Sequence, residues 1–242
     1  MTAPDQQPTQ PTQPTRETQE TRAIRVAVVD DQELMRAALR MMVESQPDLE
    51  LVGEAADGHE ALDLARSRRV DVVVMDLRMP GMDGIAVTAR ITGELPAIRV
   101  LALTTFDVDD YVLPALRAGA SGFLLKDARA EEIVDAIRTV HAGHGVVAPS
   151  TTRRLIEHVA AIPAADAGRA AQIRSRLTAR ELDMLRELAT GESNAEIARR
   201  LHLSENTVKT HVGHVLGKLG LRDRVQAVVL AYETGLVAPR RE

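Results

Sequence analysis

The apolar and mostly β-branched run at residues 72–75 constrains the fold of this chain most, because it leads directly into Asp76. The run shows no alternation of polar and apolar residues, which predicts a strand buried on both faces, as in a parallel sheet. Pro80 and Gly81 follow and favour a turn. Asp76 is therefore expected at the carboxyl end of a buried strand, where open α/β sheets gather ligands and chemistry. Taken alone, an Asp at this place is also explained by capping of the next turn.

Three other apolar runs also end in polar side chains: residues 24–29 precede Asp30 and Asp31, residues 99–103 precede Thr104, and residues 122–125 precede Lys126. The carboxyl ends of parallel strands lie at one edge of a sheet, so these groups are expected to meet there. Chance is enough to explain one strand that ends in a polar side chain. Four strands whose ends supply carboxylates, a hydroxyl and an amine favour a functional site.

Segments with helical periodicity separate these runs throughout residues 24–142. The first of them, for example, places apolar side chains three and four residues apart: Leu34, Met35, Ala38, Leu39 and Met42. Strand and helix alternate five times in this way, which predicts an α/β domain with a parallel sheet, right-handed crossovers and helices on both faces. Pro114 lies inside the fourth expected helix, at residues 107–118, and is expected to shorten or kink it.

The carboxyl-terminal part of the chain has a different, purely helical pattern. Thr178 followed by Glu181 predicts a capping box that opens a helix. A short helix at residues 194–201, a tight turn at residues 202–204 and a longer helix at residues 205–219 follow. Two helices across a three-residue turn are typical of a helix-turn-helix. A generic helical bundle is also compatible with this pattern.

The longer helix separates its residues into two faces. One face is an apolar stripe for the core: Val208, Val212, Val215 and Leu219. Another face carries Asn206, Lys209, Thr210 and Gly213 at helical spacing, with little negative charge. This compact polar face suits a DNA major groove, where lysine and asparagine reach base edges or phosphates. The predicted DNA-contacting set is Asn206, Thr207, Lys209, Thr210, Gly213 and His214.

The formal net charge of -5 conceals an uneven distribution. Residues 24–142 carry 21 acidic and 13 basic side chains, whereas residues 174–242 carry 9 acidic and 12 basic ones. The first part therefore suits a cation-binding site, and the second tolerates a polyanion. A mildly basic segment alone does not establish nucleic-acid binding.

The absence of cysteine excludes disulfides and thiolate metal sites. No apolar run approaches the roughly 18 residues of a membrane span. Residues 1–23 are rich in Pro, Thr and Gln and lack an apolar signal core, so we expect a disordered tail there. We expect a cytoplasmic protein without a membrane partner.

Together, the four polar strand ends and the alternating pattern make residues 24–142 resemble the receiver domain of a bacterial two-component response regulator. Residues 176–237 resemble a LuxR-type helix-turn-helix, so the whole chain is similar to the NarL/FixJ subfamily. The resemblance implies a flavodoxin-like, doubly wound sheet of five parallel strands in the order 2-1-3-4-5, followed by an all-α DNA-binding domain. Residues 143–175 are expected to be a linker with its hinge at residues 163–171, and residues 238–242 a tail.

The resemblance also assigns roles to the acidic residues. Asp76 is implied to be the phosphoacceptor. Asp31 and Asp76 are implied to bind Mg²⁺ directly, Asp30 through a water molecule, and the main-chain carbonyl of Arg78 to complete the set. This agrees with general chemistry, because Mg²⁺ prefers octahedral oxygen ligands and is commonly held by one or two carboxylates.

Three further residues match positions of the resembling family. Lys126 is implied to pair with the phosphoryl oxygens, and Thr104 to donate a hydrogen bond to one of them. Thr104 and Phe123 match the hydroxyl and aromatic positions of the family's conformational switch. Core packing alone also explains Phe123.

The resemblance implies a DNA-binding response regulator that is not a dedicated enzyme. Its implied partners are a sensor histidine kinase, promoter DNA and a second copy of the chain after phosphorylation, with RNA polymerase as a further candidate. One alternative is a transcription factor that keeps the fold but ignores phosphate. Another is an aspartyl-phosphate hydrolase, although such enzymes usually need a second Asp two residues after the nucleophile, where this chain has Arg78.

Overall fold

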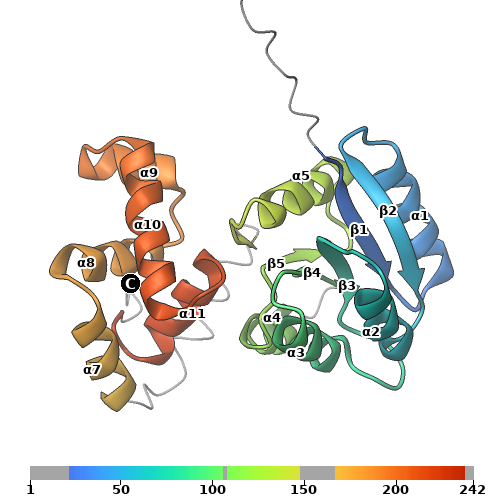
Figure 1. The fold of residues 1–242 in the computed structure, drawn as a ribbon, viewed down its shortest axis with the longest axis horizontal. Coiled ribbons are helices and arrows are strands. Elements are labelled where there is room, and N and C mark those ends of the chain that lie inside the picture. The colour runs from blue at the N-terminus through green and yellow to red at the C-terminus, as the bar shows by residue number, and fades with distance from the viewer. Residues whose placement is uncertain (1–21, 106–107, 148–166, 238–242) are drawn as a thin grey trace, which may run out of the picture.

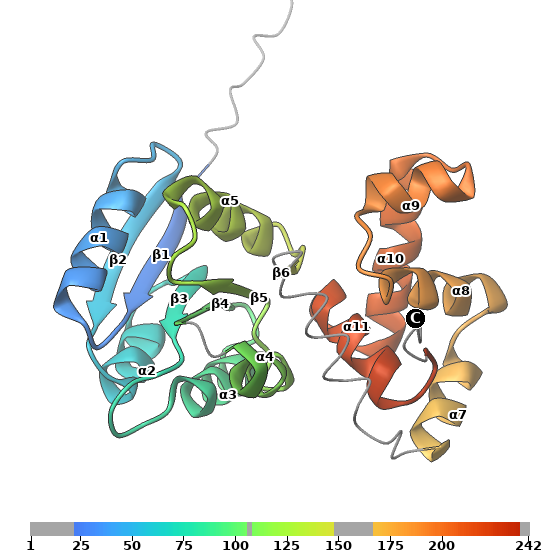
Figure 2. The ribbon, with the colours of Figure 1, turned by 180° about the vertical axis from the view of Figure 1, so that it is seen from behind.

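The computed structural model of the 242-residue chain describes residues 22–105, 108–147 and 167–237. Both expected tails lie outside these residues, apart from residues 22 and 23. Figures 1 and 2 show two parts side by side: a sheet domain, residues 22–147, and a helical domain, residues 167–237.

All described strands of the sheet domain pair in parallel, in the order β2-β1-β3-β4-β5-β6. Their bounds are β1 (Ile24–Val29), β2 (Leu49–Ala55), β3 (Val72–Asp76), β4 (Arg99–Thr104), β5 (Gly122–Leu125) and β6 (Val146–Val147). The expected parallel order of five strands is confirmed. The two-residue strand β6, which the sequence pattern did not predict, extends the sheet beyond β5.

Helices cover both faces of the sheet, as expected (Figure 1). They are α1 (Glu33–Glu44) and α5 (Ala130–His141) on one face, and α2 (Gly58–Ser67), α3 (Gly84–Glu94) and α4 (Val108–Arg117) on the other. Because neighbouring residues in a strand point to opposite faces, Val72 and Val74 enter the core under α1 and α5. Val73 and Met75 enter the core under the other three helices. Both faces of β3 are therefore buried, as its unbroken apolar run predicted.

The helical domain contains α7 (Ala167–Arg176), α8 (Ala179–Leu188), α9 (Asn194–Leu201), α10 (Glu205–Leu219) and α11 (Arg224–Glu233). The helix-turn-helix consists of α9 and α10. His202 ends α9 in the left-handed conformation, with a φ of 54°, and so reverses the chain within the short turn. Ser204 then caps α10 by accepting a hydrogen bond from the backbone N–H of Thr207. None of the described helices is both long and apolar enough to cross a membrane.

The expected hinge at residues 163–171 is wrong for residues 167–171, which form the first half of α7. Ala170 and Ile173, three residues apart, are buried in the core of the helical domain and anchor this helix. The sequence pattern did not indicate this helix, because the segment is rich in alanine and small side chains give only a weak helical periodicity. Pro114, which we expected to shorten or kink the fourth helix, lies inside α4, and the helix continues past it to Arg117.

Glu181 ties the start of α8 to the end of α10. Its carboxylate accepts hydrogen bonds from the backbone N–H and the hydroxyl of Thr178, both at 2.8 Å, and from the Lys218 ammonium at 2.7 Å. The Lys218 contact, followed by the two bonds from Thr178, lowers the pKa of Glu181 from 4.5 to about 2. The capping box that the sequence predicted is therefore also an interhelical contact.

This shift predicts how the stability of the helical domain depends on pH. A carboxylate with a lowered pKa stabilises the fold above its unfolded pKa and loses that contribution as the pH falls through the folded value. We expect the melting temperature of Glu181→Gln to lie below that of the wild type at pH 6, and this difference in melting temperature to become smaller as the pH falls from 4.5 toward 2. Calorimetry over a pH series measures the difference, with a substitution of an exposed carboxylate, Asp183→Asn, as control. A difference that does not change with pH would contradict this role of Glu181.

Candidate functional site

Three carboxylates meet at the carboxyl edge of the sheet, where the sequence placed them. Asp30 and Asp76 are buried, Asp31 is partly exposed, and one oxygen of each lies within 4.8 Å of the others. Neighbouring strands produce this cluster. The register pairs Val29 with Met75, so Asp30 and Asp76 leave β1 and β3 at the same level.

Lys126 joins the cluster from β5. Its ammonium lies 2.6 Å from Asp30 and 2.8 Å from Asp76. The side chain must cross β4 to reach β3, and its backbone is held by a 2.7 Å hydrogen bond to the carbonyl of Thr104. Burial alone would lower the pKa of Lys126, but the hydrogen bonds and charges of the two carboxylates outweigh it and raise the pKa. The amine is therefore a fixed positive charge in the site.

Burial has the opposite effect on Asp76, raising the pKa of its carboxyl above the usual range. Hydrogen bonds from Lys126 and from the backbone N–H of Arg78, at 2.8 and 3.0 Å, work against that rise. These two donors hold the carboxylate in a defined orientation. Asp76 does not merely cap the next turn, because its second oxygen faces Lys126.

The donor set of the acidic cluster fits a divalent metal ion. Three carboxylates face a single ammonium group, so negative charge is in excess. Moreover, Oδ1 of Asp31 is buried and has no hydrogen-bonding partner in the part of the chain that the structure describes. Hard cations such as Mg²⁺ take carboxylate and carbonyl oxygens as ligands. The cluster is thus consistent with a metal site.

Thr104 and Phe123 lie on adjacent strands near this cluster. Both side chains are fully buried, and the register pairs Ala102 with Phe123 and Thr104 with Leu125. The Thr104 hydroxyl has no hydrogen-bonding partner among the described residues. Phe123 packs in the core beneath α2, α3 and α4. Its ring is therefore already turned inward in this structure.

The sequence did not predict two features around Asp76. The guanidinium of Arg78 lies over the ring of Tyr111 in α4, 5.8 Å from the ring centroid. Both residues line a pocket of about 350 Å³, together with Asp31, Leu77, Met79, Pro80 and Asp83. Gly84 starts α3 against β3, where a Cβ atom would overlap the carbonyl oxygen of Asp76 and come within 2.7 Å of Cα of Leu77. Arg78 and Tyr111 are not linked by any sequence motif, so their contact becomes apparent only in the structure.

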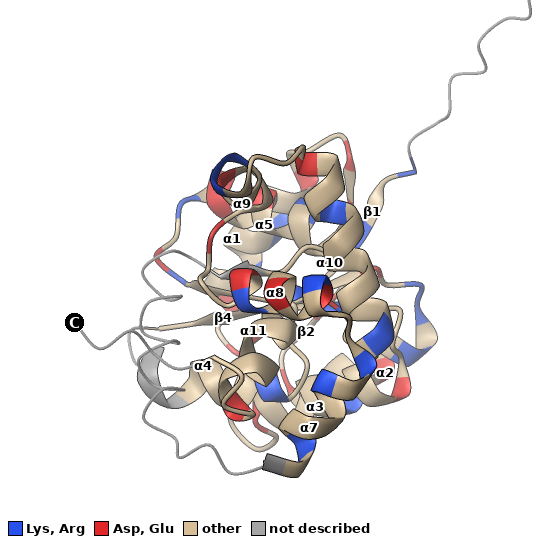
Figure 3. Cartoon of the chain, turned by 90° about the vertical axis from the view of Figure 1, so that its left-hand side faces the viewer, with Lys and Arg blue, Asp and Glu red and all other residues tan. Residues whose placement is uncertain are grey.

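The face of α10 that the sequence assigned to DNA is open. Five of its predicted residues are exposed, namely Asn206, Lys209, Thr210, Gly213 and His214, whereas Val208, Val212 and Val215 are buried. Thr207 is partly buried and engaged in the cap, with its hydroxyl 2.7 Å from that of Ser204. Lys209 is paired with Glu205 at 3.2 Å on the surface. Figure 3 shows fewer charged residues along α10 than along α8.

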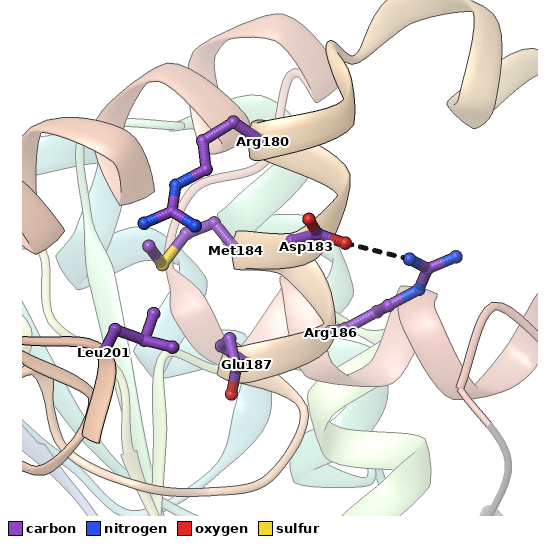
Figure 4. A pocket seen from close by; sticks show the side chains of 6 residues that line it. All are labelled: Arg180, Asp183, Met184, Arg186, Glu187 and Leu201. Atoms are coloured by element: carbon purple, nitrogen blue, oxygen red, sulfur yellow. Dashed lines mark hydrogen bonds and ion pairs between the residues drawn. The ribbon is translucent and has the colours of Figure 1, made fainter.

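A second pocket, of about 210 Å³, lies on the helical domain between α8 and Leu201 (Figure 4). Arg186 is paired with Asp183 at 3.0 Å, and Glu187 is paired with Arg200. Three of its four charged side chains are therefore already paired, and only the exposed Arg180 has no ion pair among the described residues.

Comparison with known proteins agrees with this geometry. Residues 26–138 match the response regulator receiver domain, and residues 175–231 match the bacterial regulatory proteins of the luxR family. Two curated proteins of Bacillus subtilis, the transcriptional regulatory protein LiaR and the uncharacterized transcriptional regulatory protein YxjL, are each 41% identical over 214 residues. The matches cover 88% of this chain, 99% of LiaR and 97% of YxjL.

A solved structure of a response regulator is also similar to this chain. A LuxR-family two-component response regulator from Aurantimonas sp. is 36% identical, with a TM-score of 0.53, and the match covers 56% of this chain and 96% of that one. The curated relatives are described as transcriptional regulators and not as enzymes. The chain therefore belongs to the NarL-like response regulators, transcription regulators in which a receiver domain precedes a LuxR-type DNA-binding domain.

Proposed function

We propose that Asp76 accepts a phosphoryl group from a sensor histidine kinase, and that this modification controls the binding of promoter DNA by α10 in the cytoplasm. The observation that supports this most is the buried cluster at the sheet edge. Asp76 lies within 4.8 Å of two further carboxylates and 2.8 Å from the Lys126 ammonium. Phosphoryl transfer depends mainly on positioning and charge stabilisation, and this cluster offers both.

In the proposed reaction, an oxygen of Asp76 forms a bond to phosphorus while the bond from phosphorus to the donor's imidazole nitrogen breaks. Mg²⁺, held by Asp31, Asp76 and the main-chain carbonyl of Arg78, with Asp30 acting through water, would neutralise charge on the phosphoryl oxygens. Lys126 favours the ionised form of Asp76 before transfer, against the burial that raises the pKa of this carboxyl group.

After transfer, the same side chains hold the product. Lys126 pairs with a phosphoryl oxygen, and the Thr104 hydroxyl donates a hydrogen bond to another. Movement of Thr104 toward the phosphoryl group would alter the packing beside Phe123 on the adjacent strand. The aspartyl-phosphate hydrolase alternative lacks its acid, because Arg78 occupies the position two residues after Asp76.

The helical domain would bind a two-fold symmetric operator as a homodimer, with each α10 in a major groove. Exposure of Asn206, Lys209 and Gly213 on one face of α10 supports this. Phosphorylation would favour the dimer, and contact with RNA polymerase would follow at the promoter. To move an equilibrium between restrained and released forms from 1:9 to 9:1, phosphorylation must contribute about 2.6 kcal/mol.

The phosphoacceptor assignment predicts which substitutions abolish labelling by acetyl phosphate in the presence of Mg²⁺. Asp76→Asn should remove all labelling, because the nucleophile is lost. Asp31→Asn should reduce the initial rate severely through weaker metal binding. Asp127→Asn is the matched control, because Asp127 is exposed next to Lys126. Mass spectrometry of the intact protein measures the stoichiometry, and undiminished labelling of Asp76→Asn would refute the assignment.

The assignment of α10 predicts the effect of Lys209→Ala on DNA binding. If Lys209 contacts a base edge, affinity for the selected operator should fall by about 1 to 3 kcal/mol. If it contacts only phosphate, the loss should be similar on all sequences, and the salt slope should fall by about 1. Fluorescence anisotropy at several salt concentrations separates the two cases. Arg186→Ala on α8 is the control, and wild-type affinity of Lys209→Ala on every DNA would exclude this face.

A further inference from the structure

Helix α7 and the first turn of α8 carry a cluster of arginines without an acidic residue among them. Residues 167–180 contain four arginines and no aspartate, glutamate or lysine. All four are exposed, and we name them the α7 basic patch: Arg169, Arg174, Arg176 and Arg180. Most of α7, residues 167–174, lies outside both segments that match the known families. The family match therefore assigns no role to this helix.

Neighbouring carboxylates do not neutralise the positive charge of this patch. Arg174, Arg176 and Arg180 form no ion pair within the part of the chain that the structure describes. The next acidic residue along the chain, Glu181, is buried and already bound to Lys218. The patch therefore presents uncompensated positive charge to solvent.

Stabilisation of the helices themselves does not explain the whole patch. Arg174 and Arg176 lie in the last turn of α7, where the helix dipole favours a positive charge. Arg169 and Arg180 lie in the first turns of α7 and α8, where the same dipole disfavours a positive charge. Local helix stability thus accounts for one half of the patch and opposes the other.

The patch has a fixed place on the helical domain. Ala170, Ile173 and Leu177 are buried at a spacing of three and four residues, and they anchor α7 on the core of this domain. Helix α8 begins directly after residues 177–178, so both helices that carry the patch are held. A ligand of this patch therefore does not have to order the backbone of a flexible arm, which would weaken its binding.

The patch lies at the carboxyl-terminal end of α10. Helix α7 contacts α10. The 2.7 Å bond from Lys218, in the last turn of α10, to Glu181 places the start of α8 at the same end. Figure 3 shows the basic bands of α7 next to this end of α10. The exposed residues of α10 continue to Gly217 and Lys218, and so lead from the predicted DNA-contacting face toward the patch.

The chemistry of the patch fits the phosphate backbone of DNA. Guanidinium groups bind phosphate oxygens in a bidentate geometry. A recognition helix contacts base edges mainly through its amino-terminal residues. Helix α10 has 15 residues and is thus about 22 Å long, whereas the major groove is only about 12 Å wide. When the amino-terminal part of α10 contacts bases, its carboxyl end and the adjacent patch therefore lie close to a phosphate strand.

We propose that the α7 basic patch binds the phosphate backbone of DNA beside the groove that α10 enters. Its position relative to this groove rests on the assignment of α10 in the proposed function. Phosphate contacts raise the affinity for every sequence, whereas base contacts select the sequence. The patch therefore contributes affinity that does not depend on sequence, and α10 contributes the selection.

Three double variants of the full chain test this patch. Arg174→Gln with Arg176→Gln, the glutamine pair, removes two exposed positive charges from α7. Arg68→Gln with Arg69→Gln is the control pair, because it removes the same charge from exposed positions of the sheet domain. Arg174→Lys with Arg176→Lys, the lysine pair, keeps the charge, and lysine also binds phosphate, as a point charge.

The probe is a random-sequence DNA duplex, and fluorescence anisotropy from low to physiological salt gives the affinity and its salt dependence. Each phosphate contact contributes about 0.9 to the slope of log affinity against log salt, so the glutamine pair should lower this slope by about 1.8 for each bound copy. Its affinity at about 0.1 M salt should fall by roughly tenfold. The control pair should stay within about twofold of the wild type, and the lysine pair within about threefold.

An unchanged salt slope in the glutamine pair would overturn the proposal, because no phosphate contact would have been lost. An equal fall in the control pair would also overturn it, since net charge alone would then explain the effect. So would a lysine pair as weak as the glutamine pair, because a phosphate contact depends on charge. Random DNA carries no operator and no phosphodonor is added, so these results are independent of Asp76. Lys209→Ala separates the patch from α10: if this variant bound the selected operator like the wild type while the glutamine pair lost slope, the assignment of α10 would fail and the patch would stand.

Discussion

The ammonium group of Lys126 lies 2.6 Å from Asp30 and 2.8 Å from Asp76, and much of the sheet domain serves to hold it there. Without this charge, three neighbouring carboxylates would repel one another in a largely buried place, where Coulomb interactions are poorly screened. Even with it, negative charge remains in excess. An uncompensated negative charge is unfavourable in a buried place, so the arrangement is consistent with a site for a cation.

Much of this site could be predicted from the sequence, because its strands are buried on both faces. A strand of this kind has to be apolar throughout, so Asp76 stands out where the apolar run at residues 72–75 ends. The approach of Asp30 to Asp76 depends in addition on the order of the strands. Strand order is a long-range property that local patterns do not contain, and here it came from the family resemblance.

Other features escaped prediction because their signals are weak or not local. The first half of α7 lies in the segment expected to be the hinge, and its small side chains gave no clear helical pattern in the sequence. Ala170 and Ile173 of this helix are nevertheless buried. The pair of Arg78 and Tyr111 joins a turn to a helix 33 positions later in the sequence, and neither residue carries a motif. The sequence also did not show that the hydroxyl of Thr207, one of the predicted DNA-contacting residues, lies 2.7 Å from that of Ser204.

The apolar character of α11 left two explanations open in the sequence, a partner helix or the core of its own domain. The structure adds a third, because α4 of the sheet domain covers part of α11. This changes what phosphorylation at Asp76 would have to do. The predicted DNA-contacting face of α10 is already exposed, so a signal would not need to uncover it.

A signal that acted on α11 would have to change its contact with α4. One end of α4 lies near the carboxylates, through Tyr111 and Arg78, and the other end holds Glu233 through Arg117. A ligand shifts such an equilibrium only by the difference in its interaction with the two states. Two nitrogen atoms of the Arg222 guanidinium are buried without a hydrogen-bonding partner among the described residues, which opposes the contact between the domains. Helix α4 therefore connects the surroundings of the carboxylate cluster to α11.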